Sequence, residues 1–465
     1  MRRVTLCALW LTTLILPPST AFADDLAMTI YGNGRALVSD SRDIMFKNGE
    51  QIIELPGVSS QIQPETATFV ASGIGINEQN FDFDLLSPEK LMEKAVGSTV
   101  EIVRTNPGTG RETREKAKVL SVNNGVVIQI GNKIEVLRDD DIPTRVVFDS
   151  VPPNLRANPT LSVNVQSERA GRRNANLTYL TGGLNWRADY VAVFDEEKSK
   201  MDLQGWATLT NNTKTTFEDA DVSVIAGTAK QAGRNNYNQY NPRLNNGGNF
   251  RNAGVEQSPQ ERVGDNYLYP LPGKITVKSN QTKQVGIVDA QNVEATKIYE
   301  YRAYGYNNAN QPQSADVRIA FSNSRQTGLG EALPQGIFRV YTKDASGRSQ
   351  FIGEDQIGHI PGGSLMALKI GEAFDVKVKS QVASNREVGR RTREIEMVYT
   401  ATNATDTPTT VFIRQSLGGS YVNTDIVSES IESTRENAYT ALWPVKVGAE
   451  GETKLRFKVR QKSRW

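Results

Sequence analysis

Two carboxylates and the chain's single histidine are the residues whose types and spacing could do chemistry. Glu354 and Asp355 are adjacent, and His359 follows within the same segment. A carboxylate near an imidazole suits general acid–base catalysis, and one histidine with two or more carboxylates suits zinc. His359 falls in a turn between two expected strands, however, and no ligand spacing supports a metal. We therefore expect a turn histidine that forms local hydrogen bonds.

A serine triad is a second reading of the same region, with Ser364 as nucleophile. Residues 362–366 read GGSLM, which lacks the closing glycine of a nucleophile elbow and its strand-to-helix context. The sequence therefore predicts no catalytic, cofactor-binding or metal-ligating set, and it implies no cofactor.

Asp82 and Asp84 form another carboxylate pair, alternating with Phe81 and Phe83 along an expected strand. Side chains two residues apart on a strand lie about 7 Å apart on one face, which suits a metal or acid–base chemistry. We favour the simpler interpretation, a solvated face opposite a buried one.

Tyr299 and Tyr301 are in phase on an expected strand, and Tyr304 is in the opposite phase. Aromatic side chains with a period of two most often pack within a sheet. The alternative is an exposed platform that stacks on sugar rings.

Composition narrows the classes of partner that this protein could bind. The formal charge is +2 for 465 residues, which gives no electrostatic basis for binding nucleic acid. The one cysteine, Cys7, lies in residues 1–23, which have the basic start, apolar core and Ala-x-Ala end of a Sec-type secretory signal peptide. After cleavage the mature chain would contain no cysteine, hence no disulfide. No later apolar run is long enough to span a bilayer as a helix.

The strands that must position these residues are clearest over residues 177–226. Within residues 177–194, one face of an expected strand carries a set of apolar side chains with a period of two: Trp186, Ala188, Tyr190, Ala192 and Phe194. Residues 201–209 repeat the pattern, and 221–226 follow as a third strand. This pattern predicts half of a β-sandwich.

The domain organisation predicted from turns and composition follows the chain. After the signal peptide come an N-terminal β region (24–86), a short helix with an SH3-like barrel (87–150), a β-sandwich core (160–372) and an immunoglobulin-like sandwich (373–465). Asn-, Gln- and Gly-rich residues 228–264 are expected to be a disordered loop within the core. The fold class is therefore all-β with tandem sandwich modules.

The short helix should begin after Ser87, a capping residue followed by Pro88 in the first turn. Five strands are predicted at 99–104, 113–121, 126–130, 133–137 and 144–148. The second of them alternates basic and acidic side chains, which indicates an exposed face with ion pairs rather than an RNA-binding strand.

Four segments carry a resemblance to a known family. Residues 179–190 read YLTGGLNWRADY, 333–341 read LPQGIFRVY, 351–355 read FIGED and 360–363 read IPGG. In this order they resemble the bacterial family called domain of unknown function 4139, over roughly the C-terminal two-thirds of the chain. Residues 50–57, EQIIELPG, resemble the N-terminal companion region of its larger, mucoidy-inhibitor-like relatives. These relatives often carry a coiled coil, and this chain shows no sustained heptads.

The resemblance implies an all-β envelope protein and brings no established catalytic residues. Together with the signal peptide it predicts a non-enzymatic protein of the periplasm or outer-membrane surface in a Gram-negative bacterium, with an envelope protein or a glycan as its partner. The alternative is a carboxylate-dependent hydrolase or a glycan-binding protein that acts on envelope polysaccharide. The sequence does not specify an oligomeric state.

Overall fold

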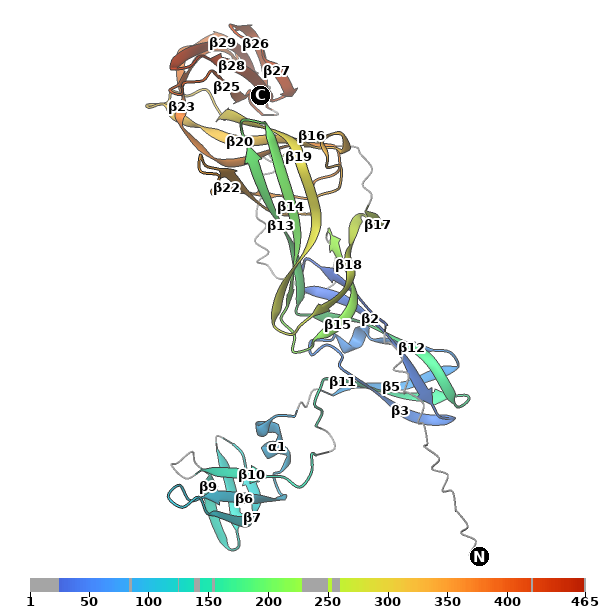
Figure 1. The fold of residues 1–465 in the computed structure, drawn as a ribbon. Helices are drawn as coiled ribbons and strands as arrows, with labels where there is room; N and C mark the ends of the chain where they lie inside the picture. The colour runs from blue at the N-terminus through green and yellow to red at the C-terminus, as the bar shows by residue number, and fades with distance from the viewer. Residues whose placement is uncertain are drawn as a thin grey trace, which may run out of the picture. The chain divides into compact units, whose positions relative to one another are not determined.

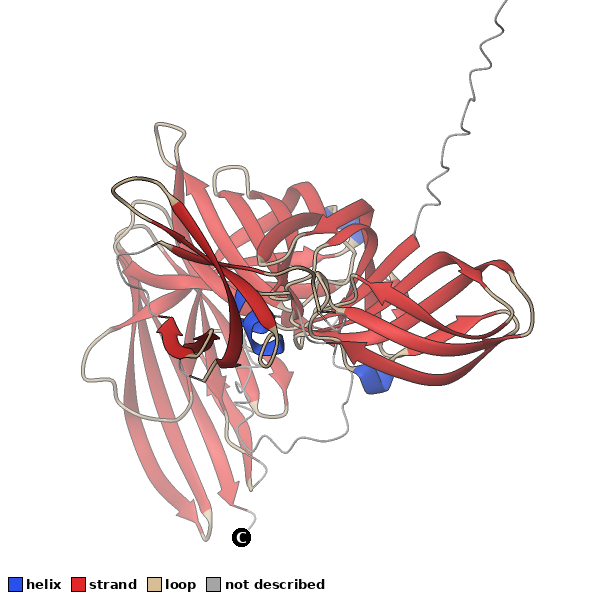
Figure 2. Ribbon diagram, turned by 90° about the horizontal axis from the view of Figure 1, so that it is seen from below, coloured by secondary structure: helices blue, strands red, loops and turns tan. Residues whose placement is uncertain are grey.

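The computed structural model describes residues 25–82, 86–123, 125–137, 143–152, 155–227, 250–252, 260–419 and 421–463. In these ranges nearly all regular structure is strand (Figure 2). The helices described there are α1 (Pro88–Lys94) and two short 3-10 helices, η1 (Pro64–Thr66) and η2 (Arg325–Thr327). The predicted all-β fold class is therefore confirmed. The predicted signal peptide and Asp84 lie outside the described residues.

The described chain divides into two compact units, each assembled from segments far apart in sequence. Unit 1 holds the residues up to Met28, Leu37–Gly182 and Thr213–Ala220, and unit 2 holds Thr29–Ala36, Gly183–Asn212 and the residues from Asp221 onward. The boundaries that we predicted follow chain order instead. Turns and composition mark where segments change, but they do not reveal which segments pack together.

Unit 1 contains a three-stranded antiparallel sheet with β11 (Thr160–Ser167) between β3 (Gly49–Pro56) and β5 (Ile74–Asp82). The prediction that the sandwich core begins at residue 160 is wrong for β11, whose partners are these N-terminal strands. β12 (Gly171–Gly182) and β4 (Thr68–Ala71) are further strands of this unit and pair antiparallel, whereas β1 (Asp25–Tyr31) and β2 (Arg35–Phe46) each have residues in both units.

The helix and the five strands of the predicted small barrel are all present, also in unit 1. Ser87 caps α1 by accepting a hydrogen bond from the Lys90 N–H at 3.1 Å. The strands adopt the order β10-β6-β7-β8-β9, with bounds β6 Thr99–Thr105, β7 Glu112–Ser121, β8 Val126–Ile130, β9 Lys133–Leu137 and β10 Thr144–Val147. Ile102, Val119 and Ile128 are fully buried in its core.

The charged face of β7 is an ion-paired surface, as predicted. Arg114 contacts Glu101 at 3.1 Å and Glu112 at 3.3 Å, and Arg145 contacts Glu112 at 2.7 Å. Each of these side chains is at least one-third exposed, so each pair adds little to stability.

Unit 2 is organised around β13 (Leu184–Asp195) (Figure 1). This strand pairs antiparallel with β14 (Lys200–Asn211) and parallel with β21 (Gly336–Lys343), which pairs in turn with β22 (Ser349–Ile357). The predicted inward face of β13 is confirmed, because all five of its apolar side chains are buried. Tyr190 stacks on Phe338 of β21 with ring centroids 4.4 Å apart.

Two long strands of unit 2 pair with different strands along their lengths. β19 (Gln281–Ala303) pairs with β14, then with β20 (Gln313–Asn323), and finally with β25 (Thr409–Ser416). β23 (Ser364–Gly389) pairs first with β20 and then with β24 (Thr392–Asn403). The predicted boundary between residues 372 and 373 therefore falls inside β23.

The C-terminal part of unit 2 is the expected sandwich of two sheets. β23 and β24 continue into β29 (Gly451–Ser463) and β26 (Val422–Glu429), while β19 and β25 continue into β28 (Thr440–Val447) and β27 (Thr434–Asn437). Between the sheets, Phe457 stacks on Trp443 with centroids 4.5 Å apart and on Tyr399 at 5.8 Å. This part of the chain therefore folds as two packed sheets around a shared core.

The polar segment at 228–264 is only partly within the described residues. Its residues 250–252 form β16 (Phe250–Asn252), paired with β23, and β17 (Glu261–Val263) pairs with β18 (Asn266–Val277). The prediction of disorder is therefore wrong for these two pieces. A segment with few apolar side chains still carries backbone donors and acceptors that pair with an available strand.

β15 (Phe217–Ala226) precedes this segment. No helix in the described ranges has the length and apolar character to cross a membrane.

Candidate functional site

Glu354 and Asp355 point to opposite faces of β22, because neighbouring side chains on a strand alternate. Glu354 is 54% exposed, and its carboxylate lies 3.4 Å from Nε of Arg339. Asp355 is half-buried, and its Oδ2 accepts a hydrogen bond from the Lys369 N–H at 2.9 Å. The structure therefore does not bring these two carboxylates together.

Asp355 lies where β22 and β23 approach each other, a line of contact that we call the seam between β22 and β23. Two residues earlier, Gly353 has a φ of +152°, and a Cβ there would lie 1.9 Å from the Ile370 carbonyl oxygen. The two backbones can approach this closely only because residue 353 has no side chain. Burial raises the pKa of Asp355, against the lowering effect of the hydrogen bond from the Lys369 N–H. The Asp355 carboxylate therefore serves to accept the hydrogen bond from the Lys369 N–H.

His359 accepts a hydrogen bond at Nδ1 from the Gln335 N–H at 3.2 Å. One residue further on, Ile360 forms an isolated antiparallel bridge with Leu333. The histidine therefore ties together two turns of unit 2, over a longer sequence distance than the local bond that we expected. Among the described residues, no three His, Cys, Asp or Glu side chains are grouped to hold a metal ion.

The two tyrosines on β19 do not form an exposed platform. Tyr301 is only 8% exposed, its hydroxyl contacts Gln313 Oε1 at 2.7 Å, and its ring meets Tyr399 edge-on at 5.9 Å. Tyr299 is partly buried against the same core. The interpretation as sheet packing is confirmed, and the sugar-stacking alternative is wrong for Tyr301.

Asp189 is a buried carboxylate that sequence analysis missed. It accepts hydrogen bonds from Thr208 at 2.6 Å, Arg339 at 3.0 Å and Arg187 at 3.0 Å. Burial alone would raise the pKa of Asp189, but these three donors outweigh it and hold the pKa below its ordinary value. The available signal was an acidic residue in the middle of a central, mostly apolar strand.

Glu300 forms a second buried ionic cluster. Its carboxylate oxygens lie 2.6 Å from Arg302, 3.4 Å from Arg318 and 3.1 Å from Arg414. Burial opposes ionisation, yet the field of Arg318 and Arg414 and the bond from Arg302 lower the pKa of Glu300 to about 2. Arg318 also contacts Asp316, and Arg414 also contacts Glu436, so three carboxylates face the three arginines. This balance of charge indicates a structural role.

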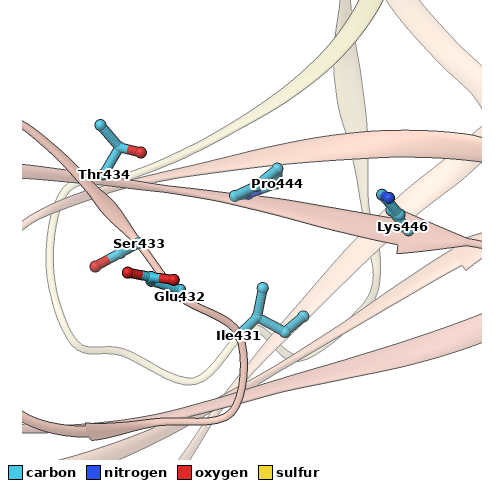
Figure 3. A pocket seen from close by; sticks show the side chains of 6 residues that line it. All are labelled: Ile431, Glu432, Ser433, Thr434, Pro444 and Lys446. Carbon is cyan, nitrogen blue, oxygen red and sulfur yellow. The ribbon is translucent and has the colours of Figure 1, made fainter.

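Unit 2 also contains two concave sites. A groove of about 560 Å³ lies on the C-terminal sandwich, between the segment Ile431–Thr434 and the side chains of Pro444 and Lys446 on β28 (Figure 3). A smaller pocket of about 270 Å³ is lined by residues of β13, β19, β20, β21, β22 and β23 and by Glu196, which follows β13. We call the first the β28 groove and the second the six-strand pocket. Glu354, Asp355, His359, Tyr299 and Tyr301 line neither of them.

Comparison with protein-family models and with curated proteins finds no match to this chain.

Proposed function

We propose that this chain is an exported, non-enzymatic protein of the cell envelope, of the kind that the family resemblance implies, which binds a partner protein through the β28 groove. Export rests on the signal-peptide pattern in residues 1–23. The resemblance to the domain of unknown function 4139 family supports the envelope location.

The β28 groove is the observation that carries this proposal. Its lining combines the apolar side chains Ile431 and Pro444 with the polar or charged side chains Glu432, Ser433, Thr434 and Lys446. Mixed linings of this kind are typical of protein interfaces, whereas glycan sites generally add aromatic rings, which this lining does not include.

β27 covers only part of the sheet edge beside the groove. β27, whose residues are all exposed, pairs with β28 only over Leu442 and residues N-terminal to it. Pro444 has no backbone N–H, and the Lys446 carbonyl accepts a hydrogen bond from Thr453 at 2.8 Å. Recognition would therefore depend on side chains in the groove more than on added strand pairing.

The test is photocrosslinking in the envelope. A photoreactive amino acid placed at Thr434 should yield a defined crosslinked product, and the same group at Thr113, on the exposed face of β7, is the matched control. Lys446→Glu should reduce the yield about tenfold or more, because reversing a charge at the contact opposes binding. Equal labelling from both positions, or a yield unaffected by Lys446→Glu, would contradict the proposal.

Export is tested separately. The mature protein should be recovered from the periplasm with Asp24 as its first residue, and deletion of residues 1–23 should leave it in the cytoplasm. A protein that retains Met1 in the envelope fraction would show that the leader is not cleaved.

A further inference from the structure

The six-strand pocket has an apolar floor built by strands that lie far apart in sequence. Phe194 comes from β13, Val317 and Ile319 from β20, Ile352 from β22 and Ile370 from β23. Ile319 is fully buried and Phe194 nearly so, so the floor is continuous with the core. A concave, mostly apolar pocket with a few polar groups is the usual form of a small-ligand site.

The volume limits what the floor can accept. A cavity of about 150 Å³ holds a benzene molecule, and the pocket measures about 270 Å³. A linear chain of about six carbons, or one large apolar side chain, therefore matches it.

The rim of the pocket is charged, and its charges are not balanced. Lys297 is paired with Glu196, and although burial opposes its charge, this carboxylate raises the pKa of Lys297 above its ordinary value. Glu372 is 67% exposed, and the nearest cation is Lys369 Nζ at 3.7 Å. That ammonium lies closer to Asp316, at 2.6 Å. The least compensated charge at the rim is therefore negative.

The geometry points to a binding site for an apolar group of about six carbons that carries a positive charge at its outer end. The apolar part fills the floor between β20 and β23, and the cation lies against Glu372. This chemistry is offered by a free alkylammonium ion and by a peptide in which a leucine precedes a lysine. The site is separate from the β28 groove.

Ligand-observed NMR on the full mature chain tests the charge preference with three probes of equal length, n-hexylammonium, hexan-1-ol and hexanoate. All three probes share the apolar contact with the floor, so their charge should decide the order. We expect hexylammonium, which Glu372 attracts, to bind most tightly, and hexanoate, which Glu372 repels, to bind least. Hexanoate binding as tightly as hexylammonium would overturn the proposal, as would the absence of binding by all three.

Two variants locate the site. Glu372→Gln should weaken hexylammonium about threefold, as expected for one partly exposed ion pair, and leave hexan-1-ol unchanged. Glu452→Gln is the matched control, since Glu452 is 55% exposed and 3.4 Å from a single lysine, Lys454. Thr342→Tyr, which adds a ring at the pocket lining, should abolish binding of both probes while circular dichroism stays β-type. Unchanged binding in both Glu372→Gln and Thr342→Tyr would place the probe elsewhere.

A capped Leu-Lys dipeptide distinguishes the two sources of this chemistry. Binding of the dipeptide, with the same loss in Glu372→Gln, would identify a protein segment as the natural occupant. Binding of hexylammonium alone would identify a free amine. Neither result depends on the crosslinking from the β28 groove, so the two proposals can fail independently.

Discussion

Glu300 and Asp355 show how surroundings decide what a carboxylate does at the scale of the residue. Glu300 is buried and Asp355 half-buried, but Glu300 lies among three arginines, whereas Asp355 mainly faces a backbone N–H. The pKa of Glu300 is therefore lowered and that of Asp355 raised. Opposite shifts predict opposite effects of pH on stability.

Glu300→Gln should destabilise unit 2 at neutral pH and much less in acid. The folded-state pKa of about 2 lies below the ordinary value of 4.5, so the ionised form contributes about 3 kcal/mol above pH ~4.5. This contribution is lost as the pH falls through the folded-state value. Urea unfolding of both proteins at pH 7 and at pH 3 measures the difference. A destabilisation that is the same at both pH values would contradict the assignment.

Asp355→Asn should behave in the opposite way. Because its folded-state pKa is raised, the ionised carboxylate costs stability once the pH exceeds the ordinary value of 3.8. Asparagine still offers an oxygen to the Lys369 N–H, so this variant should be at least as stable as the parent at pH 7 and equal to it at pH 3. Asp355→Leu removes the acceptor and should cost about 1–3 kcal/mol. An Asn variant as unstable as the Leu variant would show that the charge itself is required.

At the scale of the element, the seam between β22 and β23 depends on Gly353. An added Cβ would collide with the Ile370 carbonyl and would also strain the positive φ. Gly353→Ala should therefore lower the free energy of unfolding by about 3 kcal/mol or more.

Gly358→Ala is the control for that substitution. Gly358 lies just beyond β22, has no positive φ, and nothing lies within 4 Å of the added Cβ. Its unfolding midpoint in urea should remain near that of the parent. Similar losses in the two variants would mean that the close approach to Ile370 is not the cause.

At the scale of the whole molecule, contiguity in sequence decides which parts can fold alone. The core of the five-stranded sheet in unit 1 is drawn from one stretch, Met92 to Phe148. In the C-terminal sandwich, by contrast, β25 pairs with Tyr299–Ala303 of β19, and Tyr301 belongs to the core. Strand pairing and burial offset the entropy lost on ordering a sheet only when the strands that make up that sheet are all present.

Residues 86–150 should therefore give a dispersed amide NMR spectrum as an isolated fragment, whereas residues 373–465 should not. The second fragment keeps β24 to β29 but lacks the β19 segment, so one sheet of its sandwich is missing an edge. The full chain is the positive control for both spectra. A well-dispersed spectrum from 373–465 would show that the β19 pairing is dispensable.

Much of the fold could be predicted from local patterns, because these patterns determine which face of a strand is buried and where a helix or strand begins and ends. The alternation over Trp186 to Phe194 correctly identified a buried face, and Ser87 correctly marked the start of α1. The candidate site residues were predicted less well. Adjacent Glu354 and Asp355 suggested a pair, but a strand directs neighbouring side chains to opposite faces.

The amino-acid sequence by itself determined that this chain is all-β, where its strands and turns lie, and which side chains they bury. These properties depend on periodicity and on residues near one another in the chain. Only the tertiary structure decided that β11 joins β3 and β5, that Asp189 and Glu300 are enclosed by arginines, and that four strands supply the floor of one pocket. Strand pairing joins residues that lie far apart in sequence, and no local pattern encodes which distant strand will supply the partner.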